Sequence, residues 1–140
     1  MSDRTFFDSN VLVYLFDEDS PRKQARAKAL FEEHGRSGQI VLSPQVLQEF
    51  YVNVTRKLAR SLPQDAALSA VAHLATFPLV AVDGATVLRA VRLHQSATLS
   101  FWDALIVQAA LEGSCKKLLS EDLQHGRRFQ ELVIENPFAE

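Results

Sequence analysis

Short runs of apolar residues alternate along the chain with longer segments in which apolar positions recur every three or four residues. Short runs rich in β-branched and aromatic residues predict strands, and the longer period predicts helices. We expect strands at Thr5–Phe7, Gln39–Leu42, Leu79–Val82, Lys117–Ser120 and Leu132–Ile134. We expect helices in the apolar run VLVYLF, over Pro21–His34, from Ser43-Pro44 onward, and over Pro63–Ala75, Ala85–His94 and Phe101–Glu112.

The order of these elements predicts the class of fold. Strands that alternate with helical crossovers favour a parallel sheet that is covered on both faces. We therefore expect an α/β fold, a three-layer α/β/α sandwich around a central parallel sheet of about five strands. A chain of 140 residues without an internal repeat or a linker also predicts one domain, over residues 1–140.

The charge balance leaves the question of a nucleic-acid partner open. Fifteen basic and 17 acidic side chains give a net charge of -2, which does not indicate a nucleic-acid-binding protein. Neutralising four acids in a metal site would, however, turn that balance into +2, so a local basic face stays possible. Its candidates are Arg56–Arg60, Arg89 with Arg92, Lys116-Lys117 and Arg127-Arg128, although charge clusters of this size are more often ordinary solvated faces.

The cysteine count and the apolar runs bear on the compartment. Cys115 is the only cysteine, which excludes a disulfide within the chain and fits a reducing compartment. The start MSDRTFF does not have the pattern of a signal peptide, and no window approaches 18 uninterrupted apolar residues. We expect a cytoplasmic protein without a membrane segment.

A polar triplet, Asp-Ser-Asn at residues 8–10, interrupts an apolar stretch near the start of the chain. A buried, ionised carboxylate is costly unless it is paired or binds a metal, so Asp8 needs a partner. Asp8 directly follows the first expected strand. In open α/β sheets ligands bind at the carboxyl edge of the strands, and this is where we expect Asp8 to lie.

Two further acids follow expected strands. Asp122, in KLLSED, stands in the same relation to the fourth expected strand as Asp8 does to the first. Asp83 follows the third, in VAVDG, but the glycine and the helix after it favour a helix-capping role. We therefore expect Asp122, rather than Asp83, near Asp8.

Two acids on helices complete the candidate set. Asp103 lies in the first turn of an almost wholly apolar helix, which we expect to be buried, at the edge of the face that includes Trp102. Ser100 and Asp103 also have the spacing of a capping box, and a first-turn carboxylate can cap the helix and face a cleft as well. Glu49 projects away from the apolar stripe of its helix, which favours a solvated position. That helix follows the second strand directly, so Glu49 is still within reach of the same edge.

As a set, the four acids in their local motifs resemble a PIN domain, specifically a VapC-type toxin of a bacterial toxin–antitoxin pair. The motifs are FFDSNVLVY around Asp8, QVLQEF around Glu49, SFWDALIVQAA around Asp103 and LLSEDLQHG around Asp122. The resemblance implies a metal-dependent endoribonuclease with an α/β/α sandwich, usually dimeric and held inactive by a small VapB-like antitoxin. It places the acidic cluster on these four residues, with Asn10 and Ser120 as polar support.

One departure from the family pattern concerns the fourth motif. Many relatives continue it with a second acid and an aromatic residue, whereas this chain has Leu-Gln-His-Gly at residues 123–126. Whether Glu121 shares or replaces the role of Asp122 therefore stays open.

Several carboxylates without a neighbouring His or Cys cluster form a hard oxygen site, which suits Mg²⁺ or Mn²⁺. Such an ion can activate a bound water and stabilise charge in phosphodiester hydrolysis, here of an RNA substrate. We expect Asp8 and Asp103 as principal ligands, Asp122 as a ligand directly or through water, and Glu49 as a ligand or water-orienting base. His125 is either a proton shuttle or an ordinary loop histidine.

Two alternatives remain. A haloacid-dehalogenase-like phosphatase also begins with an aspartate after the first strand, but it needs a second acid two residues later, where this chain has Asn10. A PIN-like binding module without catalytic activity would use the same acids only to cap helices.

Overall fold

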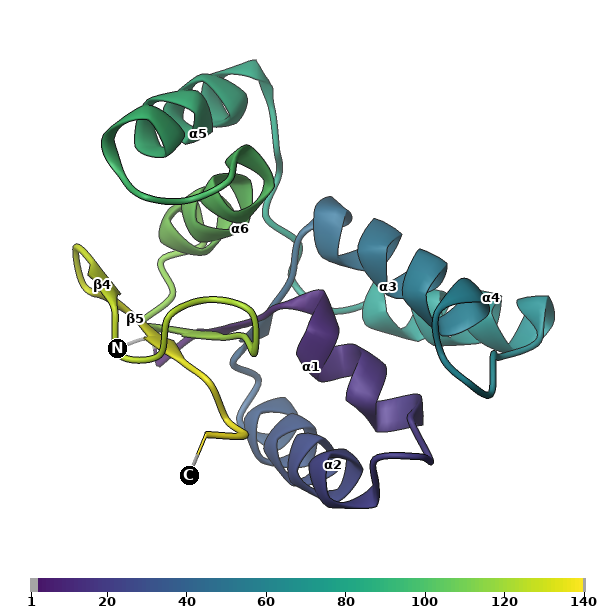
Figure 1. The fold of residues 1–140 in the computed structure, drawn as a ribbon. Helices are drawn as coiled ribbons and strands as arrows, with labels where there is room; N and C mark the ends of the chain where they lie inside the picture. Colours follow the sequence, from purple (N-terminus) through teal and green to yellow (C-terminus); the bar gives the residue numbers. More distant parts are fainter. Residues whose placement is uncertain (1–2, 140) are drawn as a thin grey trace.

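The computed structural model describes residues 3–139 and contains five strands and a series of helices within that range (Figure 1). The strands are β1 (Thr5–Phe7), β2 (Ile40–Val41), β3 (Lys117–Leu119), β4 (Arg128–Phe129) and β5 (Leu132–Glu135). The helices are α1 (Ser9–Val13), the 3₁₀ helix η1 (Tyr14–Phe16), α2 (Pro21–Arg36), α3 (Pro44–Arg56), α4 (Gln64–Leu74), α5 (Gly84–Ser96) and α6 (Phe101–Glu112).

The five strands form one sheet in the order β2-β1-β3-β5-β4. β1 pairs in parallel with β2 on one side and β3 on the other, so that Phe6 lies between Val41 and Leu118. β5 continues the parallel arrangement next to β3, and β4 adds an antiparallel edge. The carboxyl end of β1 is therefore flanked by the carboxyl ends of β2 and β3.

Helices cover both faces of this sheet. Successive side chains in a strand point to opposite faces of the sheet. Because Phe6 and Phe7 in β1, and Leu118 and Leu119 in β3, are all fully buried, both faces of the sheet must be covered. Figure 1 shows α6, with α5 packed outside it, on one side of the strands and α2 on the other. α3 packs against both α1 and α4. The predicted α/β/α sandwich around a mostly parallel sheet is confirmed.

The predicted strand at Leu79–Val82 is wrong. This segment makes only one parallel bridge, between Leu42 and Leu79, and the chain then leaves the sheet to begin α5 after Asp83. The fifth strand is instead β4 (Arg128–Phe129), which consists of two residues and carries no apolar alternation that a sequence pattern could reveal.

The expectation that the helix over residues 101–112 is buried holds for its middle, residues 104–107 and 109–110, but not for its ends, where Trp102 and Glu112 are exposed. The side chain of Trp102 is 63% exposed, although Ile106, one turn later on the same side, is buried. Within residues 3–139, no helix combines the length and the apolar character that crossing a membrane would require.

Candidate active site

Asp8 lies at the carboxyl end of the middle strand of the β2-β1-β3 group and begins α1 as its N-cap. Its side chain is buried, and neighbours donate hydrogen bonds to both carboxylate oxygens. Oδ1 accepts from the backbone N–H of Ser9 at 2.8 Å, and Oδ2 accepts from the Ser120 hydroxyl at 2.8 Å and from the Asn10 amide at 3.2 Å. The polar triplet and the end of β3 thus hold Asp8 in one orientation.

Asp8 is buried close to two other negatively charged side chains. Burial is the main cause that raises the pKa of its carboxyl to about 6, and the charges of Glu49 and Asp122 raise it further. The hydrogen bonds from Ser120 and Ser9 lower this pKa but do not offset the burial. No cation is among the groups that act on Asp8 in the described part of the chain. A positive charge brought to this position would therefore stabilise the ionised carboxylate.

Asn10 connects Asp8 to the loop after β3. Its side-chain amide also donates to Asp122 Oδ2 at 3.1 Å and to Ser120 Oγ at 3.3 Å, while its carbonyl oxygen accepts from the backbone N–H of Glu121 at 3.0 Å. The Asp122 N–H donates in turn to Ser120 Oγ at 3.2 Å. Residues 8–10 and 120–122, far apart in sequence, therefore form one polar network.

The two neighbouring acids of the fourth motif point to different partners. The Glu121 carboxylate forms an ion pair with Lys23 and accepts a hydrogen bond from the Tyr14 hydroxyl at 2.7 Å. The exposed Asp122 carboxylate accepts the amide of Asn10 instead. The carboxylate of Asp122, and not that of Glu121, shares a hydrogen-bond partner, the Asn10 amide, with the carboxylate of Asp8.

Glu49 reaches the same network from the other side of β1. α3 begins directly after β2, and its packing against α1 brings Glu49 Oε1 within 3.1 Å of the Ser9 hydroxyl, which donates to it. Gln45, one turn earlier, donates to Glu49 Oε2 at 3.2 Å. Glu49 is therefore half-buried over the carboxyl edge and not on a solvated face.

Asp103 is placed next to this group but is not bonded to it. The Gln45 amide also donates to the backbone carbonyl of Trp102 at 3.2 Å, which ties the first turn of α6 to Glu49. The Asp103 N–H is capped by the Ser100 hydroxyl at 3.1 Å, but the Asp103 carboxylate makes no hydrogen bond or ion pair within residues 3–139. A carboxylate that only completed a capping box would bond the backbone of Ser100.

The donor atoms fit a hard divalent cation, although they are not yet assembled around one. In the described part of the chain, no three His, Cys, Asp or Glu side chains form a ready-made ligand set. Neutral donors from Ser9 and Asn10 each bond two of the carboxylates, as expected where like charges repel. The side chains are oxygen ligands suited to Mg²⁺ or Mn²⁺, and the pKa of Asp8 is raised mainly by burial and further by the charges of Glu49 and Asp122.

Other residues singled out in the sequence lie elsewhere. Asp83 forms a capping box with Thr86 at the start of α5, as predicted. His125 is exposed and its Nδ1 accepts the backbone N–H of Asn136 at 2.9 Å. Ser9 and Gln45 were not predicted as site residues. The only sequence signals for them are that Ser9 follows Asp8 and that Gln45 precedes Glu49 by one helical turn.

The PIN domain family profile matches residues 5–129. The chain therefore belongs to the PIN domain family. A search of curated proteins gives no match.

Solved structures with the same fold include a toxin–antitoxin complex from Klebsiella pneumoniae. Its matching chain is 21% identical to this one, with a TM-score of 0.70, and the match covers 96% of this chain and 98% of the Klebsiella chain. VapBC2 from Rickettsia felis bound to a promoter DNA fragment is 16% identical with a TM-score of 0.61, covering 94% and 96% of the two chains. VapC20 from Mycobacterium tuberculosis, a sarcin–ricin-loop-cleaving toxin, is 19% identical with a TM-score of 0.64, covering 84% and 91%.

Proposed function

We propose that the chain is a divalent-metal-dependent endoribonuclease and the toxin of a type II toxin–antitoxin system, acting in the cytoplasm as a single nuclease domain over residues 1–140. One observation carries the proposal. Asp8 is buried at the carboxyl end of β1, Ser9 and Asn10 link it to Glu49 and Asp122, and within residues 3–139 no cation is among the groups that act on its charge. Such a site is suited to a metal ion and a phosphodiester.

In this proposal Asp8, Asp103 and Asp122 hold Mg²⁺ or Mn²⁺. The bound ion would supply a water of lowered pKa and would stabilise negative charge that develops on the phosphodiester. Asp103 contributes a carboxylate that is free of other partners within residues 3–139. Asp122 is exposed and held by one side-chain amide, so it can turn toward a ligand without breaking a buried contact.

The remaining residues orient these ligands. Ser120 and the Ser9 N–H hold the two oxygens of Asp8, and Asn10 keeps the loop after β3 beside it. Glu49, held on both oxygens by Ser9 and Gln45, is the residue that we assign to orient the attacking water and to accept its proton.

The partner is proposed from the similar structures. Two of them are described as toxin–antitoxin or VapBC assemblies and the third as an RNA-cleaving toxin. We propose a VapB-like antitoxin and a second copy of this chain as protein partners, and RNA as the substrate.

The test is cleavage of total RNA by the purified protein in Mn²⁺ and in EDTA. Asp8→Asn removes a proposed ligand charge and keeps the volume, and Asp83→Asn is the matched control on a capping aspartate. We expect cleavage only in Mn²⁺, loss of cleavage in Asp8→Asn, and nearly normal cleavage in Asp83→Asn. RNA that stays intact under all conditions would favour the binding module, which the absence of a ready-made ligand set within residues 3–139 also supports.

A further inference from the structure

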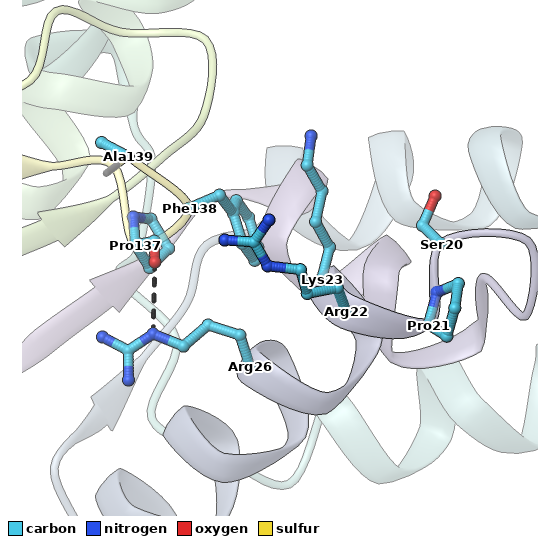
Figure 2. A pocket seen from close by; sticks show the side chains of 8 residues that line it. All are labelled: Ser20, Pro21, Arg22, Lys23, Arg26, Pro137, Phe138 and Ala139. Carbon is cyan, nitrogen blue, oxygen red and sulfur yellow. Dashed lines mark hydrogen bonds between the residues drawn. The ribbon is translucent and has the colours of Figure 1, made fainter.

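A cavity lined by basic side chains lies beside the candidate active site. A cavity of about 630 Å³, open to solvent, is formed where the N-terminal half of α2 faces the segment after β5. Figure 2 shows Arg22, Lys23 and Arg26 on the α2 side and Pro137 and Phe138 on the other. The volume lies within the range of about 300 to 1,000 Å³ that is usual for ligand sites.

The chemistry of this cavity combines cations with an aromatic ring. Lys23 Nζ lies 5.6 Å from the ring centre of Phe138 and 5.0 Å from that of Tyr14. The Arg26 Nε donates to the backbone carbonyl of Pro137 at 3.2 Å, which fixes the segment that carries Phe138. Two guanidinium groups and an ammonium group next to a partly buried ring match a phosphodiester with its nucleobase, because bases stack on aromatic faces and phosphates pair with guanidinium groups.

The cavity is joined to the active site by direct contacts. Lys23 bonds the Glu121 carboxylate, and the Glu121 backbone N–H donates to Asn10, whose amide holds Asp8 and Asp122. A strand of RNA whose phosphodiester lies at Asp8 would therefore pass close to Lys23.

We propose that this cavity is an RNA subsite, in which Arg22 and Arg26 bind a backbone phosphate and Phe138 stacks on an unpaired base next to the cleavage position. The subsite rests on the proposed function for its role in cleavage, but its binding of RNA can be measured without any catalysis. It would select single-stranded or looped RNA, because a base in a duplex cannot reach the ring.

The experiment measures binding of a fluorescently labelled single-stranded RNA to the full chain by anisotropy, in EDTA, over a series of salt concentrations. The variant Arg22→Gln with Arg26→Gln removes both guanidinium groups. Arg36→Gln, at the opposite end of the same helix, is the charge control. We expect the double variant to bind about tenfold more weakly, with a slope of log K against log salt reduced by about 1.4. Arg36→Gln should bind like the wild type.

A second variant tests the aromatic ring. Phe138→Leu keeps an apolar side chain against Tyr14 but removes the stacking surface, and we expect about fivefold weaker binding with an unchanged salt slope.

Unchanged affinity in both the double variant and Phe138→Leu would overturn the subsite. Tighter binding of an acidic glutamate-rich peptide than of the RNA, lost in the double variant, would overturn it in favour of a protein partner. A protein that never cleaves RNA but shows the expected binding losses would refute the nuclease and leave the RNA subsite standing.

Discussion

The amide of Asn10 donates to Asp122 Oδ2 at 3.1 Å and to Asp8 Oδ2 at 3.2 Å, and thereby joins carboxylates that follow two different strands. A neutral donor between two acids reduces their repulsion in the metal-free protein. The same bonds hold the loop after β3 beside the end of β1, because Asn10 also accepts the Glu121 N–H.

Asn10→Ala should therefore affect both stability and activity. It leaves the Glu121 N–H without its partner and removes the donor between Asp8 and Asp122, so we expect a loss of about 1 to 3 kcal/mol in the free energy of unfolding. Activity should fall about 10- to 100-fold, as for other residues that orient metal ligands. Urea unfolding and RNA cleavage measure the two effects. Wild-type cleavage in this variant would mean that Asn10 is not a positioning residue.

Substitutions of the two acids of the fourth motif, Glu121 and Asp122, should differ in their effect on kcat. Asp122→Asn removes a proposed ligand charge, and we expect a loss of at least about 10-fold in kcat. Glu121→Gln weakens a half-exposed ion pair with Lys23, so the free energy of unfolding should fall by only about 0.2 to 1 kcal/mol while kcat stays close to wild type. The opposite ranking of the two variants in kcat would assign the role to Glu121.

The buried Asp8 predicts a specific pH dependence of stability. Its pKa is about 6 in the folded protein against 3.8 unfolded, so the folded state binds more protons between these values and loses stability as pH rises through them. The difference of about two pH units corresponds to about 3 kcal/mol. Asp8→Asn cannot titrate there. In EDTA its free energy of unfolding, relative to wild type, should rise by about 2.4 kcal/mol between pH 4 and pH 7. A difference that stays constant over that range would contradict the raised pKa.

Association should be measurable without an antitoxin. Leu68, Leu88 and Trp102 are each more than half exposed, and a monomer with such residues has apolar surface that a second copy can cover. Light scattering over micromolar concentrations should give the mass of a dimer. A monomer at every concentration would refute the homodimer.

The elements that sequence could predict are those whose signal is local. The apolar run at residues 5–7 and the acid after it define β1 and the position of Asp8 without any knowledge of packing. The cap at Asp83 was predictable because its bonds lie within four residues. β4 was not, because two residues on an edge are paired by the partner strand and not by their own pattern.

The surroundings of Glu49 depend on tertiary contacts and show where sequence reasoning ends. Its periodicity on α3 indicates a solvated face, yet α1 packs there and brings the Ser9 hydroxyl to it. The exposure of Trp102 is likewise absent from the helix pattern, because Ile106, one turn later on the same side, is buried.

The central claim, that the carboxylates around Asp8 form a divalent-metal site, is tested most directly by melting curves of wild type and Asp8→Asn in EDTA and in Mn²⁺. Metal that binds only the folded state at a hundredfold excess over Kd adds about 2.7 kcal/mol, or roughly 5 to 10 °C in Tm for a chain of this size. We predict this shift in wild type and in the Asp83→Asn control, and only a small fraction of it in Asp8→Asn. Equal shifts in wild type and Asp8→Asn, or none in wild type, would contradict the metal site.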